Sequence, residues 1–337
     1  MIWRTMRLAT FNIESLDDSG RAQVDFDVRL SVLRPALERL DADVLCLQEV
    51  NAQHIPGQHE RQLRALERLL EGTRYAGYER AASSGPGARL FADVHNLVTL
   101  SRYPILSKRE VHHDFLAPPL HTGAGREAGR EPTPVTFERP LLLTQLQMPD
   151  GATLSVVNVH LRASLASPVA GQKRGPFAWR SVAGWAEGFY LSTVKREAQA
   201  LELRLLIEEL LARDAGALIA VAGDFNAEDF GATLRLVVAA EEDLGATELA
   251  PNSLLVLDRA LPADRRWSVL HHSRPQMLDH ILASRALYGH FRGVEVHNEG
   301  LGDEALGYGK ALHSAASYHA AVVASFDLAM AGGNGRR

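Results

Sequence analysis

The 337-residue sequence contains a single cysteine, and this scarcity excludes several kinds of scaffold and site. A lone thiol cannot form an internal disulfide or build a zinc site of the cysteine-cluster type. Cys46 lies in the apolar run Val44–Leu47, where we expect it to be a small buried side chain. The sequence also lacks an apolar run long enough to cross a bilayer.

An excess of positive charge is missing as well. The formal net charge is −5, which argues against nonspecific nucleic-acid binding through bulk electrostatics but leaves room for a local basic patch. Residues 1–7 lead into a strand-like segment without an apolar signal core or a small-residue cleavage site. We therefore expect a soluble, cytoplasmic and monomeric protein with no transmembrane segment.

The composition that remains is that of an ordinary globular protein, 46% hydrophobic and 23% charged. Several strand-like runs follow one another without a helix between them, which favours mixed or antiparallel sheets over a doubly wound parallel sheet. The expected strands are 8–13, 44–48, 96–101, 141–147, 154–161, 218–223, 277–283 and 320–326, and the expected helices are 28–40, 61–70, 193–211 and 232–240.

Two loop-like stretches, 81–87 and 117–134, interrupt this pattern. We interpret both as surface excursions, because sheet-like segments resume on either side of them. The sequence therefore predicts one domain over residues 1–330, followed by a flexible C-terminal tail at residues 331–337.

The most informative segment is Gly223-Asp224-Phe225-Asn226, which follows an apolar strand. Side chains repeat every two residues along an extended chain, so Asp224 and Asn226 project from the same side. Such a pair can hold a water and a phosphate oxygen together. The structural alternative is a turn cap, in which both side chains bond only to nearby backbone N–H groups. The segment alone favours neither interpretation.

Other apolar strands end in polar groups too. These groups are Asn12, Gln48, Glu49, Asn158, His160, Asp279 and His319. Each has a structural alternative, since a lone histidine at a strand end is more often a hydrogen-bonded surface or core residue than a catalyst. Asp279 alone could be a satisfied buried acid, and Glu49 alone could be a charge at the rim. Six strands that end in this way nevertheless point to one shared polar site.

The ordered set of motifs resembles the endonuclease/exonuclease/phosphatase superfamily, which has the deoxyribonuclease I-like fold. The motifs are Thr10-Phe11-Asn12, Leu47-Gln48-Glu49, Asn158-Val159-His160, Gly223-Asp224-Phe225-Asn226, Leu278-Asp279-His280 and Tyr318-His319, with His95-Asn96 to Pro104 resembling a further segment. The resemblance runs from about Leu8 to Asp327. It implies a mixed α/β (α+β) fold, a four-layer α/β/β/α sandwich of two mixed β-sheets flanked by helices.

The resemblance also implies a metal-dependent hydrolase acting on ester bonds. Phosphoester hydrolysis needs a hard cation, an activated water in line with the leaving oxygen, and neutralisation of the charge on phosphorus. Glu49 is the expected Mg²⁺ ligand, because Mg²⁺ prefers one or two carboxylates with waters and substrate phosphate. Mn²⁺ is the alternative ion. The resemblance places Asn12 beside the ion.

Catalytic roles follow from the same resemblance. Asp224 would orient or deprotonate the attacking water, and Asn226 would donate to the phosphate. His319 and Asp279 resemble the family's His–Asp pair, in which the carboxylate fixes the imidazole tautomer. His160 would bond a non-bridging oxygen or protonate the leaving group, and the division of acid and base work between the two histidines stays open.

One position departs from the family pattern. The family has Ser-Asp-His where this chain has Ser317-Tyr318-His319, and a tyrosine cannot supply the carboxylate charge near the metal. We expect reduced metal affinity, a preference for one ion over two, or a phosphate hydrogen bond from Tyr318. A catalytically weakened binding module is the non-enzymatic alternative.

Substrate choice is expected to depend on the segments between motifs. Asn96 and Arg162 are candidate substrate contacts, and the long segment after Arg162 interleaves cations with aromatic residues. Lys173, Arg174 and Arg180 would hold a phosphate while Trp179 or Trp185 stacks on a base or covers an apolar group. The structural alternative is a surface insertion whose tryptophans form a satellite core.

The sequence thus predicts a Mg²⁺-dependent phosphodiesterase, nuclease-like, whose partner is a phosphoester substrate such as a nucleic acid. The alternative is a phosphatase acting on inositol phosphates, lipids or other small phosphoesters. A lipid enzyme would favour export or a membrane-binding apolar loop, and neither is evident in the sequence.

Overall fold

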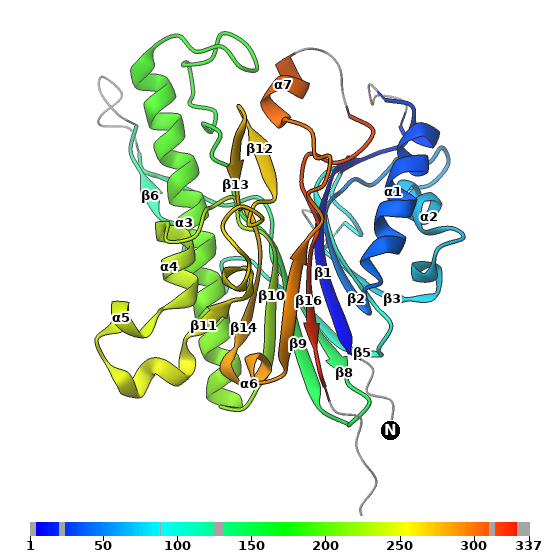
Figure 1. Ribbon diagram of the computed structural model, residues 1–337. Helices are drawn as coiled ribbons and strands as arrows, with labels where there is room; N and C mark the ends of the chain where they lie inside the picture. The colour runs from blue at the N-terminus through cyan, green and yellow to red at the C-terminus, as the bar shows by residue number, and fades with distance from the viewer. Residues whose placement is uncertain are drawn as a thin grey trace, which may run out of the picture.

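Two six-stranded sheets pack face to face, and helices cover their outer faces (Figure 1). This computed structural model describes residues 5–19, 24–85, 87, 89–123, 131–309 and 314–328, so the predicted tail at 331–337 lies outside the described residues. The arrangement confirms the predicted four-layer α/β sandwich.

The first sheet is mixed. Its strands are β1 (Met6–Leu16), β2 (Val44–Val50), β3 (Glu79–Ala82), β4 (Asn96–Ser101), β15 (Phe291–Val296) and β16 (Val322–Phe326). They lie in the order β15-β16-β1-β2-β4-β3. Only β1 and β2 run parallel, and the other neighbours are antiparallel.

The second sheet has the same sequence of strand directions. Its strands are β5 (Ile105–Val111), β8 (Leu141–Gln147), β9 (Thr153–His160), β10 (Leu218–Asp224), β11 (Leu254–Val256) and β14 (Asp279–Ser284), in the order β11-β14-β10-β9-β8-β5. Its one parallel pair is β9 with β10. Strands β1, β2 and β16 of the first sheet therefore correspond in position to β10, β9 and β14 of the second.

Each interface between layers has its own apolar core. The helices are α1 (Phe26–Leu40), α2 (Arg64–Leu70), α3 (Val182–Arg213), α4 (Ala232–Val238), α5 (Glu241–Leu244), α6 (Arg285–Tyr288) and α7 (Glu304–Gly309). Helices α1 and α2 pack on the first sheet, and α3 and α4 pack on the second. A third cluster fills the space between the sheets and includes Leu8, Val44, Val156, Ala220 and Val322. Two short hairpins, β6/β7 (Leu120–His121 and Thr133–Pro134) and β12/β13 (Val269–His271 and Arg274–Gln276), lie outside both sheets.

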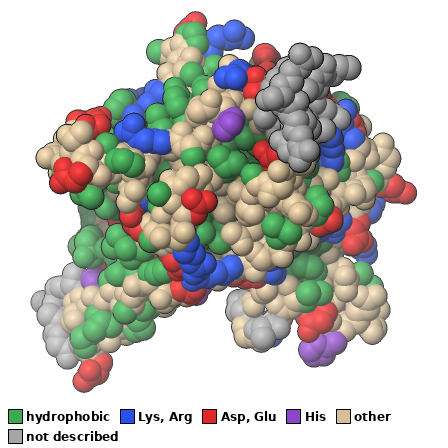
Figure 2. Space-filling view, turned by 90° about the horizontal axis from the view of Figure 1, so that it is seen from below, with side chains coloured by type: hydrophobic (Ala, Val, Ile, Leu, Met, Phe, Trp, Pro, Cys, Tyr) green, Lys and Arg blue, Asp and Glu red, His purple; other side chains and the backbone are tan. Residues whose placement is uncertain are grey.

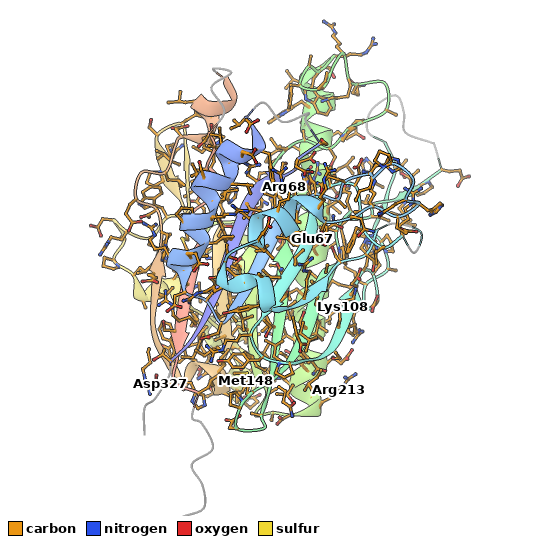
Figure 3. The ribbon with its side chains drawn as sticks, turned by 90° about the vertical axis from the view of Figure 1, so that its right-hand side faces the viewer. Glu67, Arg68, Lys108, Met148, Arg213 and Asp327 are labelled. Atoms are coloured by element: carbon orange, nitrogen blue, oxygen red, sulfur yellow. The ribbon has the colours of Figure 1, made fainter. Side chains whose placement is uncertain are left out.

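Helix α3 begins eleven residues earlier than the apolar periodicity predicts. Ser181 caps it by accepting the N–H of Gly184 at 2.9 Å. The first turns carry exposed aromatic residues and glycines instead of a regular apolar face, so the sequence pattern gave no helical signal there. As a result Trp185, which precedes the helix expected at 193–211, lies in a helix that projects beyond the strand ends (Figures 1 and 3).

A buried amide pair joins the two sheets. Gln48 Nε2 donates to Asn158 Oδ1 at 2.8 Å, and both side chains are fully buried. Asn158 Nδ2 in turn donates to the backbone oxygens of Leu47 and Val98 at 3.2 and 3.1 Å. Because buried amides are costly unless they are bonded, these bonds favour one relative position of β2, β4 and β9.

The end of the molecule opposite the projecting part of α3 has a mixed surface. Figure 2 shows acidic and basic side chains interspersed over this face. None of the helices within the described ranges combines the length and the apolarity needed to cross a membrane.

Gly223 of β10 lies against Val159 of β9, and we predict that the position does not tolerate a side chain. A Cβ at residue 223 would lie 1.9 Å from the backbone oxygen of Val159. Gly223→Ala should therefore lower the free energy of unfolding by roughly 3 kcal/mol, measured by urea denaturation. The control is Gly293→Ala, where no atom lies within 4 Å of the added Cβ and little change is expected. Equal stability of the two variants would contradict the prediction.

Candidate active site

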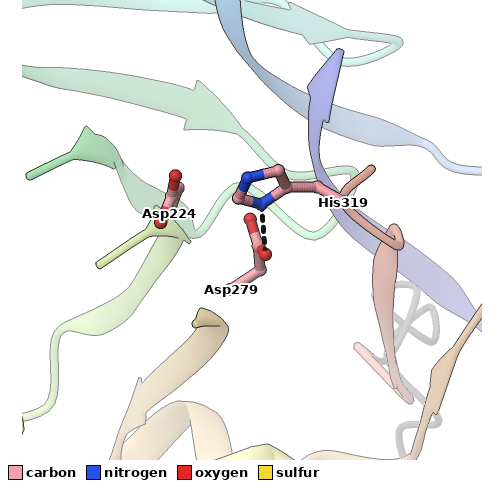
Figure 4. A group of neighbouring side chains, drawn as sticks. All are labelled: Asp224, Asp279 and His319. Carbon is pink, nitrogen blue, oxygen red and sulfur yellow. Dashed lines mark hydrogen bonds and ion pairs between the residues drawn. The ribbon is translucent and has the colours of Figure 1, made fainter. Parts of the chain in front are cut away.

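Six polar side chains from the two sheets meet at one end of the sandwich, in three pairs. Asn12 Nδ2 donates to Asp224 Oδ2 at 3.1 Å, and Glu49 Oε1 lies 3.8 Å from His160 Nε2. His319 Nδ1 bonds to Asp279 Oδ2 at 2.8 Å (Figure 4). Each pair joins corresponding strands of the two sheets. Asn12 on β1 meets the end of β10, Glu49 near the end of β2 meets the end of β9, and His319 just before β16 meets the start of β14.

Asp224 caps its turn, as the structural alternative expected, and it also bonds to two side-chain amides. Its Oδ1 accepts the backbone N–H of Asn226 at 2.8 Å, as in a turn cap. Its Oδ2 accepts the side-chain amides of Asn226 and Asn12, each at 3.1 Å. The Asn226 amide also donates to the oxygen of Leu161 at 3.1 Å, so both of its hydrogens are engaged by the protein. In this arrangement Asn226 positions the Asp224 carboxyl.

The charge state of Asp224 is shifted by its surroundings. Burial, followed by the charge of Asp279, raises the pKa of Asp224 to about 7, although His319 opposes the shift. A carboxyl with such a pKa can accept a proton near neutral pH, as a general base must.

His319 is held by a buried acid. Asp279 Oδ2 accepts both the His319 ring nitrogen and the Ser268 hydroxyl, the latter at 2.7 Å. Burial alone would lower the pKa of His319, but the charges of Asp279 and Asp224 outweigh it and raise the pKa well above its usual value. His319 is therefore an imidazolium at neutral pH, and its second ring nitrogen lies on the side of Asp224 (Figure 4).

In the pair of Glu49 and His160 both pKa values are lowered, whereas those of Asp224 and His319 are raised. Burial would raise the pKa of Glu49, but the charges of His95, His319 and Arg139 lower it below its usual value. Burial and the nearby charge of Arg139 lower the pKa of His160 well below its usual value. An ionised carboxylate thus lies beside a neutral imidazole. Glu49 Oε2 is further bonded to the backbone N–H of Ser15 at 3.0 Å.

Two residues that the sequence analysis missed, His95 and Arg139, complete this side of the site. Arg139 donates to the backbone oxygens of His160 and Leu161 at 3.0 and 2.9 Å, and its Nη1 lies 3.3 Å from His95 Nδ1. His95 Nε2 lies 3.8 Å from Glu49 Oε2. Because an arginine can only donate, Nδ1 is the acceptor and Nε2 carries the hydrogen that faces the site. The only sequence signal was the position of His95 beside Asn96.

Asn96 itself lies behind this face. It is buried, and its amide bonds to the backbone of Ala92 and to the oxygen of Val50 at 2.8 to 2.9 Å. The structure therefore places Asn96 where it holds the loop that presents His95.

Asn12 presents its nitrogen to the carboxylates. Nδ2 lies 3.3 Å from Glu49 Oε1 as well as 3.1 Å from Asp224 Oδ2, while Oδ1 accepts the backbone N–H of Glu14 at 3.0 Å. Asn12 thus bridges the two acids that the sequence assigned to the metal and to the water.

Tyr318 packs under α7. A Cβ on Gly307 would meet the tyrosine hydroxyl at 1.9 Å, so only glycine fits there. The hydroxyl accepts the N–H of Ser314 at 3.2 Å, and the backbone N–H of Tyr318 donates to Glu14 at 2.8 Å. The carboxylate that approaches this position is therefore that of Glu14, which the sequence analysis did not single out.

The residues after Arg162 that were predicted to contact substrate form a loop that packs on itself and on the start of α3. Lys173 lies 4.3 Å above the ring of Trp179, and Arg180 Nε donates to the Lys173 oxygen at 3.3 Å. Arg174 is exposed. Trp179 packs against Gly188 of α3. This packing fits the satellite-core alternative for Trp179, whereas Trp185 is exposed.

A cleft of about 790 Å³ adjoins the site at His95 and Arg139. Its lining includes His95, Arg139 and Arg162, together with Arg89 and Glu110. Its volume falls within the range of small-molecule sites, which is about 300–1,000 Å³.

The donor atoms fit a hard divalent cation. Asp224 and Asp279 each offer a carboxylate oxygen, and these atoms lie within 4.8 Å of each other and of a His319 ring nitrogen. Because His319 is protonated, the carboxylates and not the imidazole would serve as ligands. Within the described residues, Asp279 Oδ1 is buried without a hydrogen-bond partner, as expected of an atom that serves another ligand. Glu49 adds an ionised carboxylate close by, and carboxylate oxygen is the ligand that Mg²⁺ prefers.

The pKa of Asp224 predicts a pH dependence of stability for the metal-free protein. Folding raises this pKa from 3.8 to about 7, so the contribution to stability is present below pH 3.8 and is lost as the pH rises to about 7. Between about pH 4 and pH 7 the parent should lose on the order of 4 kcal/mol more than Asp224→Asn. Urea unfolding in EDTA measures this difference, and parallel pH profiles for the two proteins would disprove it.

The packing of Tyr318 predicts a structural role for its hydroxyl. Tyr318→Phe should lower the free energy of unfolding by about 1 kcal/mol, because the N–H of Ser314 loses its acceptor. The dependence of activity on Mg²⁺ concentration should stay the same. A shifted Mg²⁺ dependence in this variant would instead mean that the hydroxyl acts at the metal or the phosphate.

Comparisons with known proteins identify the family and the fold. The model of the Endonuclease/Exonuclease/phosphatase family matches residues 9–319. A search of curated proteins found no match.

Among solved structures, truncated Caenorhabditis elegans TDP2 has a TM-score of 0.54 at 15% identity, over 96% of this chain and 97% of that chain. D. rerio TDP2 complexed with single-strand DNA product has a TM-score of 0.52 at 14% identity, over 96% and 98%. The 3′ phosphatase NExo from Neisseria, bound to product DNA hairpin, has 0.51 at 17% identity, over 96% and 99%. The fold is shared, and by its match over residues 9–319 the chain belongs to the endonuclease/exonuclease/phosphatase family, a family of hydrolytic phosphoesterases.

Proposed function

We propose that this protein is a Mg²⁺-dependent phosphodiesterase, nuclease-like, that hydrolyses its substrate by in-line attack of an activated water. The observation that carries the proposal is the contrast of charge within one site. Asp224, with a pKa of about 7, lies beside the protonated His319–Asp279 pair and opposite the ionised Glu49. Groups whose pKa values are pushed apart in this way can divide acid and base work between them.

Asp224 is the group best placed to accept a proton from water. Asn226 and Asn12 fix its carboxyl from two sides, at 3.1 Å each, so its orientation is set before substrate binds. Such preorganisation lowers the barrier because no reorientation is needed during the reaction.

His319 supplies positive charge where negative charge develops on the phosphoryl group. Asp279 holds its Nδ1–H, which leaves the other ring N–H to face a phosphoryl or leaving-group oxygen. His160 and His95 are neutral donors on the Glu49 side, and each lies 3.8 Å from a Glu49 oxygen.

Glu49, with Asp224 and Asp279 close by, would hold Mg²⁺, and the ion when bound would polarise a phosphoryl oxygen and neutralise charge on phosphorus. Mn²⁺ would suit the same oxygen ligands.

Nucleic acid is the substrate class we favour. Two structural neighbours are described with DNA product, a single strand in D. rerio TDP2 and a hairpin in NExo. NExo is also described as a 3′ phosphatase, so hydrolysis of a phosphomonoester is the alternative. A cytoplasmic monomer, with one domain over residues 1–330, remains part of the proposal.

The activity test uses the purified chain with bis-p-nitrophenyl phosphate as the diester and p-nitrophenyl phosphate as the monoester. Mg²⁺ should support release of nitrophenol from the diester, and EDTA should abolish it. Glu49→Gln, Asp224→Asn and His319→Ala should each lower kcat by about 100-fold or more, because each removes one charged group of a cooperating set.

The matched control is Arg213→Ala, an exposed charge at the far end of α3 (Figure 3). It should leave the rate unchanged. Turnover of the monoester alone would exclude the diesterase in favour of a phosphatase. If no metal-dependent release occurs from either compound, from plasmid DNA or from single-stranded DNA or RNA, the enzyme proposal fails.

A further inference from the structure

The segment after His160 folds into an ordered projection, which we call the arm and define as residues 162–190. Two glycines of α3 let its loop pack closely on the helix. A Cβ at Gly184 would meet the Gln172 side chain at 2.4 Å, and one at Gly188 would meet the ring of Trp179 at 2.7 Å. Ser181 ties the two parts together by capping α3 and donating to Gln172 at 2.9 Å.

The side chains that the arm does not bury are unusually apolar. Phe177 is 94% exposed at the loop, and Val182, Trp185 and Phe189 are 82%, 46% and 38% exposed on α3. These three helix positions have the spacing i, i+3 and i+7, so they form one stripe along the helix. Leu165 adds a further apolar side chain that is 67% exposed. An apolar patch of this kind on a folded protein marks an interaction surface.

The arm is also basic, although the whole chain is acidic. Residues 162–190 contain Arg162, Lys173, Arg174 and Arg180 against the single acid Glu187, in a protein with a formal net charge of −5. Lys173, Arg174 and Arg180 flank the exposed Phe177 in the sequence, and the bridge between Lys173 and Trp179 closes this loop. Apolar and cationic side chains therefore share the outer part of the arm.

This combination suits a lipid surface better than a nucleic-acid strand. Bases need open aromatic faces on which to stack. Here Trp185 and Phe189 stack on each other, with ring centroids 5.6 Å apart, and Lys173 lies over the face of Trp179. Phe177 and Tyr190 do expose their rings, but Val182 and Leu165, which are also strongly exposed, are aliphatic and offer bases no stacking surface.

We propose that the arm is a peripheral docking element for an anionic lipid surface. Val182, Trp185 and Phe189 would enter the headgroup–acyl boundary, as the apolar face of an interfacial helix does, while the arm's lysine and arginines meet anionic headgroups. The arm projects from the end of the sandwich where the catalytic strand ends meet (Figures 1 and 3), so docking would bring the site close to the lipid surface. The proposal is independent of which phosphoester is cleaved.

The test is cosedimentation with vesicles of phosphatidylcholine alone and of phosphatidylcholine with phosphatidylserine. The parent should bind the phosphatidylserine vesicles, and the double variant Trp185→Ser/Phe189→Ser should bind at least about tenfold more weakly, because two large apolar side chains lose their burial in lipid. The triple variant Lys173→Gln/Arg174→Gln/Arg180→Gln should lose the preference for phosphatidylserine.

The control is Phe230→Ser, which removes a 71% exposed aromatic residue outside the arm and should bind as the parent does. Thermal unfolding followed by circular dichroism verifies that each variant is folded. Absence of binding to phosphatidylserine vesicles, or equal binding by the parent and the double variant, overturns the proposal. Two further results would overturn it. If the protein does not bind vesicles but forms a dimer that the double variant abolishes, the stripe serves a second copy. If it does not bind vesicles but binds a single-stranded oligonucleotide and the double variant abolishes that binding, the stripe serves a nucleic acid.

Discussion

The site depends on how the two sheets face each other. Each of its three pairs, Asn12–Asp224, Glu49–His160 and His319–Asp279, has one member in each sheet region. A small slide of one sheet over the other would separate all three together. The apolar cluster between the sheets and the buried Gln48–Asn158 bond oppose such a slide, so the packing beneath the site sets its geometry.

Matching strand directions explain why so many polar groups meet. In each sheet one parallel pair carries two strand ends to the same edge, and an antiparallel neighbour begins there. This edge therefore collects acids and histidines that are taken out of water together. Burial then shifts their pKa values in different directions, because a buried charged group is stabilised mainly by the charges of its neighbours and not by water. The pKa values of Asp224 and His319 are both raised, whereas the pKa of Glu49 is lowered and its carboxylate stays ionised.

The segments around the polar site do not repeat the correspondence between the two sheets that the site itself shows. On one side a cleft lined by His95 and Arg139 adjoins the site, and the arm continues into α3. Glycines decide the shape of both the centre and its rim. Gly223 lets β10 lie against β9, Gly188 lets Trp179 close on α3, and Gly307 makes room for Tyr318. The specific features of this chain therefore lie in segments that a common fold leaves free to vary.

The local pattern with a period of two was enough to predict the main strands and their polar ends, and the resemblance of the motifs to the family implied the sandwich. The start of α3, the edge strands β3, β5, β11 and β15, and the roles of His95 and Arg139 had no such pattern. Contacts between residues distant in the chain decide these features. Asp224 and Tyr318 illustrate the difference. The sequence by itself determined that an acid and a tyrosine occupy these two positions. Only tertiary packing decided that the acid is buried between other charges while the tyrosine ring turns under α7.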